Sequence, residues 1–298
     1  MKELTRKQFD VLCAYAEAQS PITQRDLATA LDFSLGTVNR VVGELASRGL
    51  IFDGKITPDG LNALEPYRAR RAVFIAAGFG SRLVPVTLNT PKPLVRVNGK
   101  RIIDGLIDAV LAAGIEEIII VRGYLSEQFD QLLYKYPMIK FIENPAFNEA
   151  NNISSAMCAR YLLQNAYVFE ADLLIYNPKI VRKYNYSSNF LGIKMARTDD
   201  WCFEVDGDGI ITEQKIGGVD CWQEVGISYW DEDDGKKLSE HIEAAYKMPG
   251  GKERYWDQVP FVVFRGEYNV EIRECKKEDI VEIDTFNELK AIDKTYDV

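Results

Sequence analysis

A glycine-rich turn that directly follows an apolar run is the feature that most restricts the fold of this chain. Residues 72–76 read AVFIA, and residues 76–82 read AAGFGSR. A continuous apolar run is expected of a buried parallel strand, and glycines let backbone N–H groups approach a polyphosphate without a clash from Cβ. The sequence therefore predicts an α/β domain whose first strand ends in a phosphate-binding turn.

The residues around this turn separate it from two common nucleotide-binding turns. A dinucleotide-binding fingerprint needs a third glycine where this chain has Leu83, and the chain lacks the G-K-[ST] of a Walker loop. Instead, Arg82 lies in the turn, and Lys92 follows within residues 91–94 (PKPL). Arginine as a planar fork and lysine as a point charge can both neutralise phosphate. Arg82 and Lys92 are therefore predicted to act on the phosphates.

Strands and helices alternate after this turn. Helices are predicted for residues 102–113, 126–136 and 152–163, and strands for residues 118–121, 139–142 and 166–169. Beyond residue 190 the pattern changes to strands and hairpins, at residues 191–196, 201–205, 210–214 and 225–230. This order predicts an α/β fold with a mixed, mostly parallel sheet.

The first 66 residues have a different pattern. Helices are predicted over residues 5–18 and 23–30, a third helix begins at Ser34 and ends at Gly49, and Asp53-Gly54 predicts a hairpin. Three helices and a small β-wing resemble the MarR-like winged helix-turn-helix family, in whose DNA-binding members the third helix enters the major groove. We therefore expect a small winged helix-turn-helix domain at residues 1–68, a polar junction, and the α/β domain at residues 71–298.

Charge leaves the role of this first domain open. Residues 1–70 contain nine basic and nine acidic side chains, whereas DNA-binding domains usually present a basic surface. Two interpretations are compatible with this balance: DNA binding through residues 1–66, and a packing or dimerisation role that gives a homodimer.

The composition excludes several classes of protein and site. The net charge of −9 disfavours nucleic acid and anionic membranes as general partners of the whole surface. The N-terminus lacks the apolar core of a signal peptide, no apolar run is long enough to span a membrane, and five scattered cysteines indicate reduced thiols. These features predict a cytoplasmic protein without membrane insertion. Because His241 is the only histidine, a histidine-rich zinc site is excluded.

The glycine-rich turn and the PKPL segment together resemble the signature of nucleotidyltransferases with a GT-A-like, Rossmann-like fold. Over residues 71–298 the chain is similar to bacterial CTP:phosphocholine cytidylyltransferases, through segments such as IIIVRGYLSEQF, ENPAFNEANNISSA and VEIDTFNEL. The resemblance implies transfer of CMP from CTP to phosphocholine, with Mg²⁺ as cofactor and pyrophosphate as product. Because a phosphate monoester is already a nucleophile near neutral pH, catalysis would rest on positioning and charge neutralisation rather than on a general base.

The resemblance also implies which residues form the nucleotide and metal sites. Asp172 ends an apolar strand, where ligands of open α/β sheets bind, and a carboxylate there can hold Mg²⁺. Taken alone, an aspartate after a strand is more often a cap or turn residue. Asp284 is the implied second metal ligand and also fits the N-cap of a final helix. The implied catalytic residues are Lys92, Arg82 and Asp172, and the implied nucleotide-binding residues are Ala76, Ala77, Gly78, Gly80, Ser81, Arg82, Lys92 and Asn151.

An aromatic-rich stretch is the predicted acceptor site. All four tryptophans lie between residues 201 and 256. A quaternary ammonium donates no conventional hydrogen bond, so aromatic faces and a carboxylate suit it, each cation–π contact contributing roughly 0.5–2 kcal/mol. Core or hairpin packing is the alternative for each ring taken singly. The predicted acceptor-binding residues are Trp201, Tyr229, Tyr255, Asp257 and Glu282.

Two other functions are compatible with the sequence. The first keeps the reaction but changes the acceptor to a sugar phosphate, phosphoethanolamine or aminoethylphosphonate. The second is a DNA-binding regulator whose α/β domain only senses a nucleotide. Two acidic segments are predicted to be turns without a metal role: residues 206–209 (DGDG), which lack the later ligands of a calcium loop, and residues 231–235 (DEDDG).

Overall fold

The computed structural model describes residues 3–18 and 20–297, which divide into two compact units. One unit comprises the chain up to Arg68 together with Tyr184–Tyr186, and the other comprises Ala69–Lys183 and the chain from Ser187 onwards. Each unit has hydrophobic core residues of its own.

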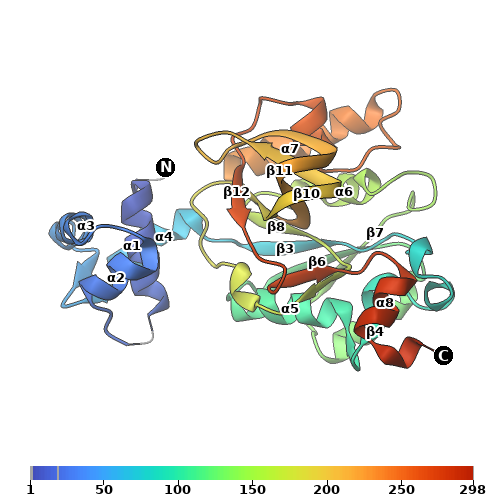
Figure 1. Ribbon diagram of the computed structural model, residues 1–298, viewed down its shortest axis with the longest axis horizontal. Coiled ribbons are helices and arrows are strands. Elements are labelled where there is room, and N and C mark those ends of the chain that lie inside the picture. Colours follow the sequence, from blue (N-terminus) through green and yellow to red (C-terminus); the bar gives the residue numbers. More distant parts are fainter. Residues whose placement is uncertain (1–2, 19, 298) are drawn as a thin grey trace. The chain divides into compact units, whose positions relative to one another are not determined.

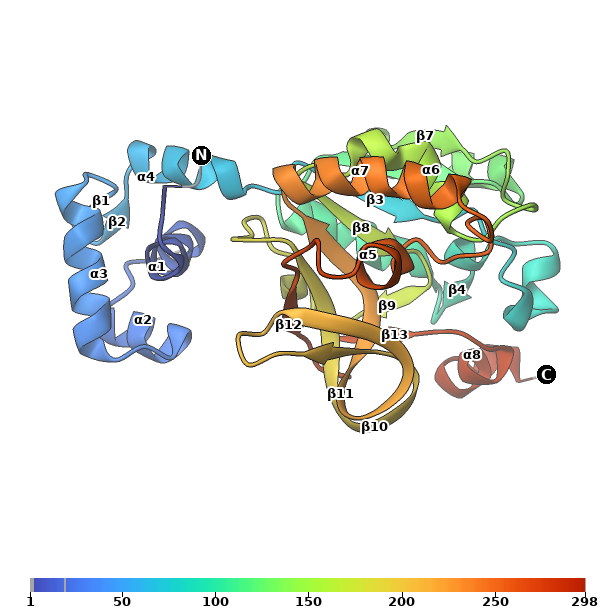
Figure 2. The same ribbon diagram turned by 90° about the horizontal axis from the view of Figure 1, so that it is seen from above.

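The first unit is a winged helix (Figure 2). Thr23 and Ser34 begin the second and third helices by accepting hydrogen bonds from the backbone N–H groups of Asp26 and Thr37, as their sequence positions predict. Its elements are α1 (Arg6–Glu17), α2 (Gln24–Leu31), α3 (Leu35–Ser47), β1 (Ile51–Phe52), β2 (Lys55–Ile56), α4 (Pro58–Leu64) and a 3₁₀ turn at Glu65–Tyr67.

The core of this unit joins the helices to a later segment of the chain. Leu12, Leu27 and Leu45 are fully buried on facing sides of α1, α2 and α3. The ring of Tyr186 stacks on the ring of Tyr67, with the two centroids 5.6 Å apart. Residues 184–186 are therefore part of the same packed unit as the winged helix.

The second unit is an α/β domain built on a seven-stranded sheet. Its regular elements are β3 (Arg71–Ile75), β4 (Arg96–Val97), β5 (Lys100–Arg101), α5 (Ile102–Ala112), β6 (Glu117–Arg122), β7 (Lys140–Glu143), α6 (Ile153–Ala159), β8 (Ala166–Glu170), β9 (Leu173–Ile175), β10 (Asn189–Val205), β11 (Ile211–Trp230), α7 (Glu232–Lys247), β12 (Glu271–Glu274), β13 (Ile280–Glu282) and α8 (Phe286–Ile292).

The sheet has the strand order β12-β10-β11-β8-β3-β6-β7. β3 pairs in parallel with β6 and β8, β6 with β7, and β10 with β12, whereas β11 is antiparallel to both of its neighbours. The predicted fold class, a mixed and mostly parallel sheet, is confirmed.

Helices cover both faces of the sheet (Figure 1), and alternating side chains of the central strands pack against the helices on opposite faces. On β3, Phe74 packs in the core formed with α5, and Val73 packs in the core formed with α6 and α7. On β6, Ile120 packs in the core formed with α5, and Ile119 packs in the core formed with α6 and α7. Because both faces are covered, the strands need no polar residues, which explains the continuous apolar runs.

Beyond residue 190 the structure corrects the prediction of four separate strands. β10 and β11 are continuous strands of 17 and 20 residues. Their pairing shifts register between Thr198 and Trp201 and again around Cys202, and Gly217 and Asp220 have positive φ. Bulges and turn-like residues within a long strand interrupt its alternation, so the sequence shows ends where the strand only bends.

Three local predictions need correction. The acidic segment 231–235 is not a turn: Asp231 is the N-cap of α7, whose acidic first turn suits the positive end of the helix dipole. The predicted helix at residues 126–136 is a 3₁₀ helix at Ser126–Tyr134, and α6 ends at Ala159. The N-cap of the final helix α8 is Thr285 rather than Asp284.

The predicted turn at residues 206–209 is confirmed. Residues 206–209 form a tight turn in which the Asp206 N–H donates to the Ile210 carbonyl. Within the described part of the chain, no helix combines the length and apolar character needed to cross a bilayer.

Candidate active site

The glycine-rich turn and Asp172 lie at the same edge of the sheet. β3 and β8 are neighbouring parallel strands, with Ile75 opposite Glu170. The turn follows β3 and Asp172 follows β8, so both leave the sheet side by side. This is the edge at which open α/β sheets bind ligands.

Asp284 reaches this edge through the pairing of two short strands. β13 is antiparallel to β9, with Glu282 opposite Leu173. The Ile283 N–H then donates to the Asp172 carbonyl over 3.2 Å. Two aspartates that are 112 positions apart in the chain therefore lie next to each other.

The turn itself is closely packed at Gly80 and open at Gly78. Gly80 has φ +62°, and a Cβ built there would lie 2.9 Å from the Cβ of Lys92. The Thr87 hydroxyl donates to the Gly80 carbonyl over 2.8 Å. At Gly78, an added Cβ would meet no heavy atom of the described residues within 4 Å. Gly80 thus fixes the shape of the turn, and Gly78 leaves space beside it.

We expect Gly80→Ala to lower the turnover of the enzyme more than tenfold. A left-handed backbone costs a residue with a Cβ roughly 1–2 kcal/mol, and the new methyl group would push against Lys92. Gly207→Ala is the matched control, because an added Cβ meets open space there and φ is not left-handed. Unchanged turnover in Gly80→Ala, measured at a saturating concentration of both substrates, would show that the shape of the turn is unimportant.

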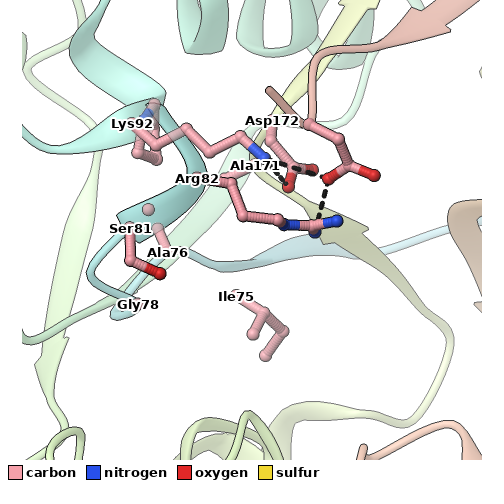
Figure 3. Close-up of a pocket in the computed structure, with 11 residues that line it drawn as sticks. Ile75, Ala76, Gly78, Ser81, Arg82, Lys92, Ala171 and Asp172 are labelled. Atoms are coloured by element: carbon pink, nitrogen blue, oxygen red, sulfur yellow. Dashed lines mark hydrogen bonds and ion pairs between the residues drawn. The ribbon is translucent and has the colours of Figure 1, made fainter. Parts of the chain in front are cut away.

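Two cations and two carboxylates meet beside the turn. The Nζ of Lys92 lies 2.8 Å from Oδ2 of Asp172 and 3.5 Å from Oδ1 of Asp284. Nη2 of Arg82 lies 2.5 Å from the same Asp284 oxygen. The side chains of Lys92 and Asp172 point toward each other in Figure 3. Lys92 is largely buried, whereas Arg82 is mostly exposed, so only Arg82 can move without disturbing the core.

Further carboxyl groups make this site strongly acidic. Carboxylate oxygens of Glu170, Asp172 and Glu282 lie within 4.8 Å of one another, and so do those of Asp200, Glu282 and Asp284. Burial and the nearby carboxylates raise the pKa of Glu282 to about 10 and hold the pKa of Glu170 well above its usual range. The site therefore brings together more carboxyl groups than Lys92 and Arg82 can neutralise, so Glu282 and Glu170 hold their protons near neutral pH unless another cation enters.

These residues fit a hard divalent cation such as Mg²⁺. Oxygen ligands, and carboxylates above all, are the donors that this ion prefers. Oδ1 of Asp172 is buried and has no hydrogen-bond partner among the described residues. A bound cation would satisfy this oxygen and relieve the repulsion among the carboxylates.

Two connected cavities bring most of the predicted residues together. A cavity of about 250 Å³ is lined by Ala76, Gly78, Gly80, Ser81, Arg82, Lys92, Asp172 and Asp284 (Figure 3). A larger cavity of about 530 Å³ shares several of these residues and is also lined by Ala77, Asn151, Trp201, Tyr255, Asp257 and Glu282. The rings of Trp201 and Tyr255 meet edge to face with centroids 5.9 Å apart.

Tyr229 is the exception, and its predicted role in the acceptor site is wrong. It is fully buried on β11 opposite Tyr167 and packs in the core beneath the sheet. Its hydroxyl donates to Oδ1 of Asn165, away from both cavities. Residue type and place in the chain predict an acceptor-binding role for Tyr229, whereas the side of the strand on which its ring lies decides its role.

Asn151 and its neighbour Asn152 connect the cavity wall to the segment that contains Tyr255 and Asp257. The side-chain amide of Asn151 donates to the Glu253 carbonyl over 3.2 Å. Oδ1 of Asn152 accepts a 2.8 Å hydrogen bond from the backbone N–H of Trp256. Asn151 thus lies in the cavity wall, and its side chain hydrogen-bonds to the protein backbone at Asn152 and Glu253.

Several cavity residues were not identified from the sequence. Asn152, Glu170, Asp200 and Glu224 all line the larger cavity. Glu170 was the most accessible to prediction, because it precedes Asp172 by two positions at the end of the same strand. Glu224 lies within the bent part of β11, and no local signal marks it.

Comparison with known families matches both units. Residues 71–188 match the family model described as nucleotidyl transferase, and residues 2–55 match the MarR family. The first match covers the glycine-rich turn and Asp172, and the second covers α1, α2, α3 and β1 of the first unit.

Two curated relatives cover most of the second unit. A 2-aminoethylphosphonate cytidylyltransferase from Lancefieldella rimae is 38% identical over 228 residues, which are 76% of this chain and 92% of the relative. A choline-phosphate cytidylyltransferase from Streptococcus pneumoniae is 33% identical over 229 residues, which are 75% of this chain and 97% of the relative.

Solved structures show the same fold. The CTP:phosphocholine cytidylyltransferase of Streptococcus pneumoniae superimposes with a TM-score of 0.70 and 30% identity, over 76% of this chain and 99% of that structure. An inositol-1-phosphate CTP transferase from T. maritima shares the fold at 17% identity and a TM-score of 0.63, over 78% of this chain and 95% of that structure. Because these relatives match nearly the whole second unit, and because the glycine-rich turn and the acidic site agree with them, the chain belongs to the cytidylyltransferases of the nucleotidyl transferase family.

Proposed function

We propose that this enzyme transfers CMP from CTP to an acceptor in which a phosphate or phosphonate is joined to a small amine, and that pyrophosphate is released. Phosphocholine, the acceptor predicted from the sequence, and 2-aminoethylphosphonate both belong to this class. The observation that supports the proposal is the larger cavity, which extends from the glycine-rich turn to Trp201, Tyr255 and Asp257. One end suits a polyphosphate and the other a cation.

In the proposed reaction, an acceptor phosphate or phosphonate oxygen attacks the α-phosphorus of CTP. The bond from the α-phosphorus to the oxygen that bridges it to the β-phosphorus breaks, and pyrophosphate leaves with that oxygen. Arg82 exchanges its contact with Asp284 for the phosphates, and Lys92 acts from its place between Asp172 and Asp284, so that both neutralise charge as it develops. When bound by the two aspartates, Mg²⁺ would add further neutralisation of the phosphates.

The proposal is tested by incubating the full chain with CTP, Mg²⁺ and each of four acceptors, and by measuring pyrophosphate. The acceptors are phosphocholine, phosphoethanolamine, 2-aminoethylphosphonate and a sugar 1-phosphate. We expect release with at least one amine-bearing acceptor, loss of release when a chelator removes the metal, and recovery when Mg²⁺ is added in excess. Release with the sugar phosphate alone would refute the proposed acceptor class.

We also propose that residues 1–66 bind DNA. The winged-helix fold and the MarR match support this, and Asn39 and Arg40 on α3 are exposed. Because Glu44 pairs with Arg40 over 2.5 Å, sequence-specific contacts would have to compensate for a weak electrostatic attraction. Selection from a random DNA library with the full chain tests the proposal. Recovery of no enriched sequence, together with a dimer in light scattering, would favour the dimerisation role instead.

A further inference from the structure

Two carboxyl groups in the larger cavity are not used by the nucleotide or by the metal site. Glu224 comes from β11, and Asp257 comes from the segment that follows α7. Both line the larger cavity, and neither belongs to the groups of carboxylates that could share a metal ion. Asp257 is only 7% exposed.

Gln214 holds these two carboxyl groups in place from behind. Its Nε2 lies 2.8 Å from Oε2 of Glu224 and 2.9 Å from Oδ2 of Asp257. Because both neighbours are carboxylate oxygens, the atom between them must be the amide nitrogen, and its two hydrogens are both used. The pair is therefore fixed in position by a buried side chain that does not itself line the cavity.

One carboxylate oxygen of this arrangement lacks a donor. Oδ1 of Asp257 is buried and has no hydrogen-bond partner among the described residues. Leaving such an oxygen unpaired is unfavourable, and more so when the group is charged. Burial and the negative charge of the neighbouring Asp257 carboxyl also hold the pKa of Glu224 well above its usual range.

A ligand that satisfies these two carboxyl groups must carry both a positive charge and N–H bonds. A quaternary ammonium carries the charge, but its methyl groups would cover the Asp257 oxygen without donating to it. The predicted aromatic cage is also smaller than expected, because Tyr229 lies in the core and only Trp201 and Tyr255 of the three predicted rings line the cavity. A protonated primary amine satisfies both requirements, since it donates up to three hydrogen bonds.

We infer that Glu224 and Asp257, held by Gln214, form a subsite for a protonated primary amine, so that the acceptor is an aminoalkyl phosphate or phosphonate rather than a choline ester. The inference rests on the proposed function and specifies its acceptor. It assigns the selection of the amine to Glu224 and Asp257 as binding residues and to Gln214 as a positioning residue.

The test is a series of acceptors that differ only in methylation of the nitrogen. Phosphoethanolamine, its N-methyl and N,N-dimethyl derivatives and phosphocholine are compared as substrates of the full chain, with 2-aminoethylphosphonate added to compare phosphonate with phosphate. We expect kcat/KM to fall with each methyl group, and by at least about 100-fold from phosphoethanolamine to phosphocholine, because a site built to accept hydrogen bonds rejects an analogue that lacks the donors.

Two variants link this preference to the named residues. Glu224→Gln and Asp257→Asn keep the size of each side chain but remove its charge, so we expect the preference for the primary amine over phosphocholine to shrink at least tenfold while KM for CTP stays constant. A variant that merely folds poorly would lose activity on both acceptors alike and keep their ratio. Glu213→Gln is the matched control, because Glu213 directly precedes Gln214 in the sequence but pairs with Arg265 and does not line the cavity.

The outcomes separate the inference from the function on which it rests. Equal or better use of phosphocholine in the unmodified enzyme overturns the inference and leaves the proposed function intact. An unchanged preference in both variants also overturns it. Pyrophosphate release with none of the acceptors overturns the proposed function and the inference together.

Discussion

Replacing Asp172 with asparagine is expected to lower kcat about a thousandfold without destabilising the protein. Asp172 has a buried oxygen that no described residue satisfies, and it lies among carboxylates that suit a divalent cation. Charge stabilisation by a bound metal ion contributes several kcal/mol, and about 1.4 kcal/mol corresponds to a factor of ten in rate. Asparagine has the same shape but cannot supply the second anionic ligand. The rate is measured as pyrophosphate release at saturating Mg²⁺.

Stability should respond in the opposite direction to activity in this variant. Asp172 lies close to Glu170, Glu282 and Asp284, so removing one negative charge relieves repulsion, and Lys92 keeps Asp284 as a partner. We therefore expect the free energy of unfolding in urea to be unchanged or raised. Asp233→Asn on the exposed first turn of α7 is the control for the loss of a carboxylate. A kcat within threefold of the unmodified enzyme would show that Asp172 does not serve the reaction.

Replacing Lys92 with methionine is expected to lower both kcat and stability. As a cation held beside the glycine-rich turn, Lys92 should stabilise charge on the phosphates, and removing one preorganised group of this kind costs about 10²–10³-fold in kcat. Lys92 is also largely buried between Asp172 and Asp284. Removing one partner of a buried ion pair typically costs about 3–5 kcal/mol, so the urea midpoint should fall clearly.

The contrast in stability between Asp172→Asn and Lys92→Met is the informative result. Lys179→Met, on an exposed lysine outside both cavities, controls for the loss of a surface cation. If Lys92→Met were stable and fully active, the close contact of Lys92 with the two aspartates would be incidental. If it were unstable but active once folded, Lys92 would serve the fold alone.

The sequence predicted the parts of the site that depend on strand ends. The apolar run at residues 72–76 and the turn after it are local signals, and Asp172 follows a second run of the same kind. Parallel strands bring their carboxyl ends to one edge, so these residues could be expected to meet. Asp284 was predicted only through family resemblance, because its position depends on the pairing of β13 with β9, which no local pattern reveals.

The acceptor end of the cavity was harder to predict for a physical reason. Which face a strand residue occupies depends on register, and β10 and β11 change register within their length. Residue type therefore predicts Tyr229 in the cavity although it lies in the core. It does not mark Glu224, five positions earlier on the same strand, although Glu224 lines the cavity. No local sequence signal marks Gln214, and only its contacts show that it holds Glu224 and Asp257.

The pairing of β13 with β9 also determines when the acidic site can form during synthesis of the chain. A ribosome synthesises the glycine-rich turn and Asp172 well before it reaches Asp284, so a growing chain can form the parallel strands β3, β6 and β8 while the second aspartate does not yet exist. Only when residues 280–284 have been translated can they dock beside β9 and complete the acidic centre. A nascent chain that stops short of residue 284 thus lacks one of the two aspartates, and the proposed metal site can form only after residues 280–284 have been made.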